Sequence, residues 1–218
     1  MRPVFVAGIG STRFGKHPQT TIESLAVDAG AQALVQSGIE RSRIGAVYLG
    51  NFISGPMNGK EVLAGLVAEQ LGLSGIPCTK VEGACASGGI AFRHAVWMVA
   101  SGVCEAVLVV GVETMTHAGT AELTSALNCA MDNESDGRNG LTFPGLFGLA
   151  WRTHARQYGT TREEVAPVGD PGDRPARGRD GGDPDAVGGQ RRLNVADARS
   201  ARGLREDAHL RPARVVCR

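Results

Sequence analysis

Short apolar runs that alternate with helix-like stretches are the feature that most constrains the fold of this chain. The clearest run, Ala106–Gly111, has no polar side chain, which is typical of a strand buried on both faces. A buried strand is also expected at Val4–Ile9, and further strands at 46–50 and 77–81. Because apolar residues at helical spacing separate these runs, the sequence predicts an α/β architecture.

Helix boundaries are marked by capping residues. Thr20 and Glu23 have the spacing of a capping box, so a helix is expected to begin there and to end at Gly38. Further helices are predicted over residues 61–71, 86–100 and 147–158. Residues 117–144 are polar and irregular, and a loop of this length inside a domain is more often functional than accidental.

The composition changes abruptly after Ala166. Beyond Pro167 the chain has no Lys, Ile, Phe, Tyr, Trp or Met, so it has few groups with which to form a core. A second capping box, Thr161-x-x-Glu164, is followed by Pro167 and Gly169, which should end that helix within about a turn. We therefore expect a folded domain over residues 1–166 and a disordered tail over residues 167–218. Arg, Gly, Asp, Ala and Pro dominate the tail, as they do when GC-rich codons are read out of frame, and we interpret it as frameshifted.

Composition also argues against several classes of function. No apolar run approaches the roughly 18–20 residues that a membrane span needs, and the first residues lack the pattern of a signal peptide, so a cytoplasmic location is expected. Five cysteines without C-x-x-C spacing argue against a disulfide framework or a zinc site. The tail interleaves 11 basic with 8 acidic side chains and has no aromatic residue, which argues against nucleic-acid binding.

The strongest chemical signal is the segment Gly83-Ala84-Cys85-Ala86-Ser87-Gly88-Gly89, between a predicted strand and a predicted helix. A cysteine at a helix N-terminus lies beside unpaired backbone N–H groups and the positive end of the helix dipole, which favour the thiolate. Small neighbours leave room for a substrate, so the pattern suits covalent acyl transfer. On this local pattern alone, Cys85 as a small buried apolar residue remains an equal alternative.

The segment around Cys85 resembles the nucleophile motif of thiolases, in particular those of the sterol-carrier-protein type. Three more stretches are similar to the family and follow in the right order, so that the resemblance covers almost all of residues 4–166: GIGSTRFGK at 8–16, GVETM at 111–115 and YGTTREE at 158–164. A ketosynthase is the alternative within the superfamily, and the GVETM context favours a thiolase.

The resemblance implies a thiolase fold, in which this chain is the N-terminal βαβαβαββ half of an αβαβα layered stack. Cys85 would take the acyl group of an acyl-CoA or 3-ketoacyl-CoA, and its backbone N–H would contribute to an oxyanion hole. Residues 117–147 would shape the acyl pocket, with Phe147 as a wall. No metal or redox cofactor is implied, since coenzyme A enters with the substrate, and the full-length form would be a homo-oligomer.

The family's second half supplies a histidine in a Gly-His-Pro-like context and a second cysteine in a Cys-x-Gly context. Neither motif occurs here, and Cys217 lacks the glycines. We therefore expect the chain to be inactive alone; the alternatives are a non-catalytic scaffold or acyl-CoA-binding subunit, and a remnant without function. Four other residues are expected to be structural or inert: His94, His154, Cys104 and Cys129.

Overall fold

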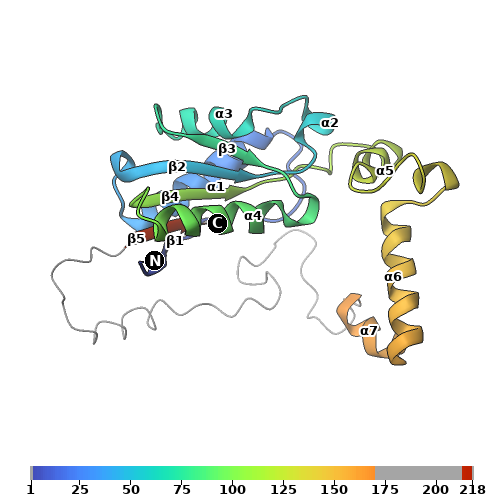
Figure 1. Cartoon of the computed structure of the whole chain (residues 1–218). Coiled ribbons are helices and arrows are strands. Elements are labelled where there is room, and N and C mark those ends of the chain that lie inside the picture. Colours follow the sequence, from blue (N-terminus) through green and yellow to red (C-terminus); the bar gives the residue numbers. More distant parts are fainter. Residues whose placement is uncertain (1, 170–212, 218) are drawn as a thin grey trace. The chain divides into compact units, whose positions relative to one another are not determined.

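The parallel sheet is the centre of the first of two units in this computed structural model, which describes residues 2–169 and 213–217. Of these residues, 2–114 and 213–217 belong to the first unit, and 115–169 to the second. The sheet has five strands in the order β1-β5-β4-β2-β3, and every neighbouring pair is parallel (Figure 1). The strands are β1 Val4–Gly8, β2 Ile44–Gly50, β3 Cys78–Val81, β4 Ala106–Gly111 and β5 Ala213–Cys217.

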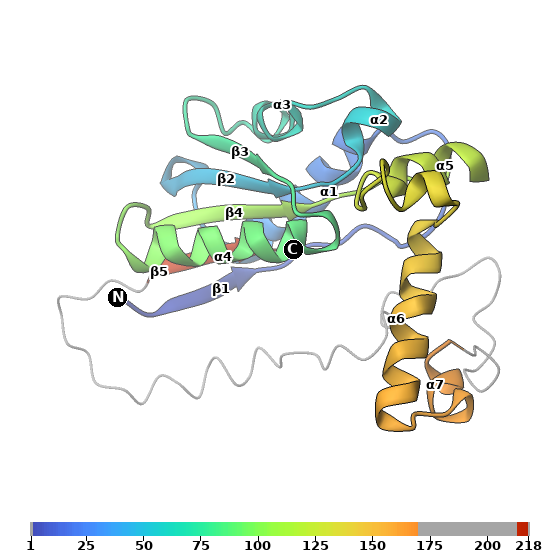
Figure 2. The same ribbon diagram turned by 45° about the vertical axis from the view of Figure 1, so that its right-hand side comes forward.

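Helices cover both faces of this sheet, so the predicted α/β architecture is confirmed (Figure 2). The helices of the unit are α1 Ile22–Ser37, the short α2 Ser54–Asn58, α3 Leu63–Gln70 and α4 Ser87–Ala100. Alternate strand residues divide between two cores, because successive side chains of a strand point to opposite faces. Leu49 and Leu108 pack with α1 and α3, whereas Ala46 and Val107 pack with α4.

The expectation of burial holds for β4 and fails for β1. The first five residues of β4 are all buried, since helices cover both of its faces. In β1, Phe5 and Val6 are 49% and 51% exposed. The reason is position: β1 is an edge strand of the sheet, and α4 packs mainly on β2 and β4.

The start of α1 differs by one residue from the predicted capping box. Thr21, not Thr20, is the N-cap, and its hydroxyl accepts from the backbone N–H of Ser24 at 3.2 Å. Glu23 is 5% exposed and forms an ion pair with Lys60. The end of the helix is as predicted, with Gly38 at a φ of 61°.

Two findings concern the predicted tail and its boundary. Helix α7, Arg162–Gly169, continues through Pro167 and has eight residues, so the boundary expected at 166 falls inside a helix. The last described residues, 213–217, form β5 and pair with both β1 and β4. A strand in this place satisfies backbone groups that β1 and β4 would otherwise leave unpaired. Most of the predicted disordered tail, 170–212, lies outside the described residues.

The fifth strand is reached differently from the last strand of the βαβαβαββ pattern. In that pattern the last two strands follow each other without a helix between them. Here α5 Thr120–Asn128, α6 Phe143–Tyr158 and α7 come between β4 and β5. A parallel neighbour requires a long crossover connection rather than a tight turn.

The second unit, described over residues 115–169, is helical and corrects the prediction of an irregular loop at 117–144. Helix α5 occupies nine residues of that stretch, because AELTSALN places residues compatible with a helix after Thr120. Helix α6 begins at Phe143, four residues before the predicted start. The Thr142 hydroxyl caps it by accepting from the N–H of Gly145 at 3.2 Å.

The ion pair of Glu23 predicts a dependence of stability on pH. Burial raises the pKa of Glu23, but hydrogen bonds, first that of Lys60, outweigh it, so the pKa lies below the usual 4.5. The ionised group therefore stabilises the fold above pH 4.5, and this contribution disappears as the pH falls through the folded-state pKa. We expect Glu23→Gln to lower the free energy of unfolding by about 1–2 kcal/mol at pH 7. This value lies between the contributions of exposed and of buried ion pairs.

Urea denaturation at a series of pH values measures this effect. The difference between wild type and Glu23→Gln should shrink as the solution is acidified. Glu105→Gln, which removes a half-exposed pair with Arg43, should have little effect at any pH. A difference for Glu23→Gln that does not change with pH would contradict the assignment.

Candidate active site

The carboxyl ends of three parallel strands lie side by side, and this end of the strands is called the carboxyl edge of the sheet below. Gly50, at the end of β2, is in register with Val81 of β3 and with Gly111 of β4. The residues that follow these strands therefore emerge side by side. In open α/β sheets this edge is where ligands bind.

Cys85 lies at this edge, directly after β3. It is the middle residue of a short 3-10 turn, Ala84–Ala86, which leads into α4. Cys85 is exposed, so the alternative of a small buried residue is wrong. The placement at a helix start agrees with the sequence pattern, while the catalytic role of the thiol remains a prediction.

The turn before Cys85 has a backbone conformation that is unusual for its residue type. Ala84 has a φ of 47°, and no other non-glycine residue of the described chain has a positive φ. Such a conformation costs roughly 1–3 kcal/mol and persists only when the surroundings hold it. It is therefore a second reason, beside the motif, to regard this turn as functional.

Three hydrogen bonds hold the turn. The N–H of Ala84 donates to Oε1 of Glu82 at 2.6 Å, and the N–H of Gly83 donates to the Ser87 hydroxyl at 3.0 Å. The Ser87 hydroxyl in turn donates to the carbonyl oxygen of Ala84 at 2.7 Å. Ser87 is 5% exposed, so the first side chain of α4 acts as a buried anchor for the segment that presents Cys85.

A close approach of two backbones sets the position of α4 against the sheet. A Cβ at Gly50 would lie 2.7 Å from the nitrogen and Cα of Gly88 and from the carbonyl carbon of Ser87. These are backbone atoms and cannot rotate away. Only glycine at the end of β2 lets the first turn of α4 come this near.

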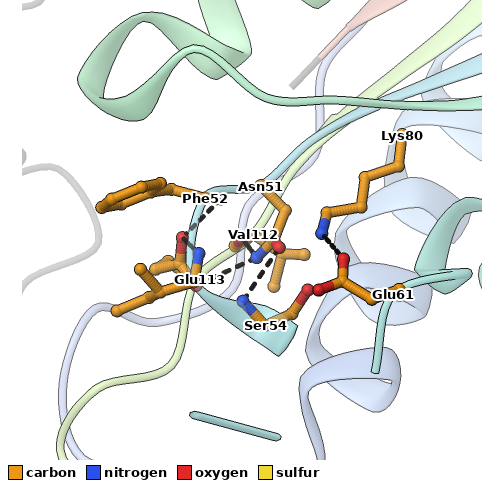
Figure 3. A network of polar contacts seen from close by, with 8 residues as sticks. Asn51, Phe52, Ser54, Glu61, Lys80, Val112 and Glu113 are labelled. Atoms are coloured by element: carbon orange, nitrogen blue, oxygen red, sulfur yellow. Dashed lines mark hydrogen bonds and ion pairs between the residues drawn. The ribbon is translucent and has the colours of Figure 1, made fainter. Parts of the chain in front are cut away.

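A polar network joins the segments that follow β2 and β4 (Figure 3). Glu113, just after β4, accepts at Oε1 from the Asn51 amide at 2.9 Å. Its Oε2 accepts from the backbone N–H groups of Phe52 at 2.9 Å and of Ile53 at 3.3 Å. The half-buried carboxylate is thereby bound to three consecutive residues of the other segment.

Asn51 is the centre of this network. It is 2% exposed, and its amide also donates to the carbonyl oxygen of Val112 at 2.9 Å. Its Oδ1 accepts from the N–H of Ser54 at 3.1 Å, and its own N–H donates to the carbonyl of Val81 at 3.1 Å. One side chain and its backbone therefore connect the ends of β2, β3 and β4.

A second polar contact lies near this network. Lys80 of β3 donates to Glu61 at 2.5 Å (Figure 3). A Cβ on Gly55 would lie 1.9 Å from Oε1 of Glu61, so only glycine leaves room for this carboxylate. The hydroxyl of Ser54 is buried and has no hydrogen-bond partner among the described residues.

The sequence interpretation missed Asn51 and included Glu113 only as part of a resemblance. A weak signal was present, since a polar residue directly after an apolar strand run falls at the edge where ligands bind. No local sequence pattern could show that Glu113 bonds to Asn51 and Phe52, because these residues are 62 and 61 positions away from it.

The remaining cysteines and histidines occupy other environments. Burial raises the pKa of the Cys104 and Cys78 thiols, and Cys129 is exposed beyond α5. His94 is half-buried and packs against aromatic side chains, 5.7 Å from Tyr48 between ring centroids. His154 is exposed and contacts Thr160 at 3.1 Å.

Phe147 belongs to the second unit and is 57% exposed. Its role as a pocket wall stays a prediction.

Within residues 2–169 and 213–217, no group of three or more His, Cys, Asp or Glu side chains is arranged to hold a metal ion.

None of the helices in the described part of the chain is long and apolar enough to cross a membrane.

The strand–turn–helix around Cys85, with a parallel sheet behind it, defines an α/β protein that presents a cysteine at a helix start. The chain belongs to the thiolase family: residues 4–169 match the family's N-terminal domain.

Two archaeal proteins and one human protein illustrate the likeness. An acetyl-CoA acetyltransferase of Methanocaldococcus jannaschii is 43% identical over 166 residues, which are 76% of this chain and 42% of that protein. Its counterpart in Methanothermobacter thermautotrophicus is 39% identical, over 77% of this chain and 43% of its own length. Human sterol carrier protein 2 is 30% identical, over 78% of this chain and 32% of its own length. The chain thus spans less than half the length of these relatives.

The close approach at Gly50 gives a testable prediction. Gly50→Ala should lower the free energy of unfolding by about 1–3 kcal/mol, because the added methyl group overlaps backbone atoms of α4. Gly65→Ala on α3 is the matched control, since a Cβ there meets nothing within 4 Å and should be neutral or stabilising. Thermal and urea unfolding measure both. Equal effects of the two substitutions would show that β2 and α4 do not approach as described.

Proposed function

We propose that this chain carries the nucleophile of a thiolase-type acyltransferase and that Cys85 accepts an acyl group from an acyl-CoA thioester. The observation that supports this most strongly is the exposed Cys85 in a held turn at the start of α4. Membership of the thiolase family and the acetyl-CoA acetyltransferase names of two relatives support the substrate class.

In the proposed step the Cys85 thiolate attacks the thioester carbonyl carbon. A bond from Sγ to that carbon forms, and the carbonyl oxygen becomes an oxyanion. The backbone N–H of Cys85, at the positive end of α4, is the donor we propose for this oxyanion. When the oxyanion collapses, the bond to the coenzyme A sulfur breaks, and the leaving thiolate takes up a proton. An acyl-enzyme and free coenzyme A result, and no other cofactor takes part.

Carbon–carbon bond formation needs a further base, because an α-proton must leave the second acyl group. The resemblance places that base in the C-terminal half of thiolases, which this chain does not match. The chain alone is therefore proposed to be acylated at Cys85 without completing the condensation or thiolysis. A cytoplasmic location and homo-oligomeric assembly of a full-length form remain predictions.

A second candidate is a thiolase-like subunit that binds acyl-CoA or a partner without catalysis. Exposed aromatic side chains on the first unit favour it, since Phe92 and Trp97 of α4 are 40% and 51% exposed and Phe5 of β1 is 49% exposed. Large exposed apolar groups are common where another protein surface packs.

Intact-mass spectrometry after incubation with acetyl-CoA tests the proposal. The full chain should gain the mass of one acetyl group, and Cys85→Ala should gain none. Cys129→Ala is the matched control, because Cys129 is also exposed and should leave the adduct unchanged. A folded chain that gains no acetyl group, or an adduct that survives in Cys85→Ala, would refute acyl transfer to Cys85 and leave the non-catalytic subunit.

A further inference from the structure

The carboxylate of Glu113 has a pattern of contacts that packing alone does not require. It accepts three hydrogen bonds from Asn51, Phe52 and Ile53, two of them from backbone N–H groups. The ion pairs found among the described residues join Glu105, Glu23 and Glu61 to cations, and none includes Glu113. Its charge is therefore directed at the segment that follows β2.

That segment lies against the turn that presents Cys85. The N–H of Asn51 donates to the carbonyl oxygen of Val81 at 3.1 Å. Val81 is the last residue of β3, just before the turn. Gly50, the residue before Asn51, lies so near α4 that a Cβ on it would overlap the backbone of Ser87 and Gly88. Ser87 in turn holds the two residues before Cys85 through its hydroxyl. A continuous set of contacts thus runs from Glu113 through residues 50–53 to both sides of Cys85.

Loss of the carboxylate would change this set in a definite way. The N–H groups of Phe52 and Ile53 would lose their acceptor, and the side-chain NH2 of Asn51 would keep only the Val112 carbonyl as an acceptor. Buried donors without an acceptor are unfavourable, so residues 51–53 would shift toward water or toward other acceptors. Because Asn51 is bonded to Val81, the shift would reach the turn, and the Cys85 sulfur would lose its fixed position.

We propose that Glu113 is a positioning residue for acyl transfer: it fixes residues 51–53, and these fix the turn that carries Cys85. The inference rests on the proposed function for its chemical readout. Glu113 itself touches neither the acyl group nor the thiol in this account. Its effect should therefore appear in the rate of the chemical step more than in the affinity for the substrate.

The test compares Glu113→Ala, Glu113→Gln and the control Glu105→Ala in the full chain, at a temperature where circular dichroism shows each to be folded. The rate of Cys85 acetylation is measured by intact mass at increasing acetyl-CoA concentration. Glu113→Ala should lower the maximal rate by about tenfold or more, as a small displacement of a reacting group does. The half-saturating concentration should change by less than about threefold.

Glu113→Gln should retain more of the maximal rate than Glu113→Ala, because its amide oxygen can still accept hydrogen bonds. Glu105→Ala removes an exposed ion pair and should leave both parameters unchanged. A maximal rate in Glu113→Ala equal to that of wild type would overturn the proposal. So would a loss confined to the half-saturating concentration. If Glu113→Ala does not fold, Glu113→Gln and Glu113→Asp carry the comparison.

A second readout separates this proposal from the proposed function. Iodoacetamide alkylates an accessible thiol without recognising coenzyme A, so the rate at Cys85 can be compared with the rate at Cys129 in the same sample. Glu113→Ala should lower the Cys85-to-Cys129 ratio several-fold, even if wild type takes no acetyl group from acetyl-CoA. In that case acyl transfer would be refuted and the positioning role retained. An unchanged ratio in both Glu113 variants would refute the positioning role.

Discussion

The contact between Gly50 and the first turn of α4 is the constraint on which the candidate site depends. It brings the backbone of Ser87 and Gly88 against the end of β2, where any Cβ would overlap. Because the short turn after β3 leads directly into α4, the N-terminus of α4 and Cys85 lie at the carboxyl ends of the strands. The parallel direction of the strands then places Asn51 and Glu113 at the same edge.

The site also shows how local strain and polar contacts balance. Ala84 adopts a φ of 47°, which an alanine adopts only at a cost in free energy. The Glu82 carboxylate accepts from the N–H of Ala84, and the Ser87 hydroxyl binds the N–H of Gly83 and the carbonyl oxygen of Ala84. The strain is confined to the residue before the thiol, whereas the network of Glu113 lies in the neighbouring segments. The two together explain how a short turn can hold one conformation at the end of a strand.

Sequence patterns predicted those features that depend on local periodicity. The apolar run of β4 and the helix beginning near residue 86 agree with the structure, whereas the local pattern left open whether Cys85 is buried, and the structure shows it exposed. Predictions failed where tertiary position decided the outcome. Phe5 is half-exposed because β1 lies at the sheet edge, and β5 forms because β1 and β4 both present backbone groups to pair. The network of Asn51 and Glu113 joins residues about 60 positions apart and leaves no periodic trace.

In the mechanism proposed above, the fold itself makes Cys85 a reactive thiol. The most direct measurement is the rate of iodoacetamide alkylation at Cys85 and at Cys129, in native protein and in protein unfolded by urea, followed by peptide mass spectrometry. Both thiols are exposed in the native structure, so Cys129 corrects for access and for the solvent. Folding should raise the rate at Cys85 several-fold relative to Cys129, as is typical of a thiol at a helix N-terminus. A Cys85-to-Cys129 ratio that is the same in the native and unfolded states would contradict it.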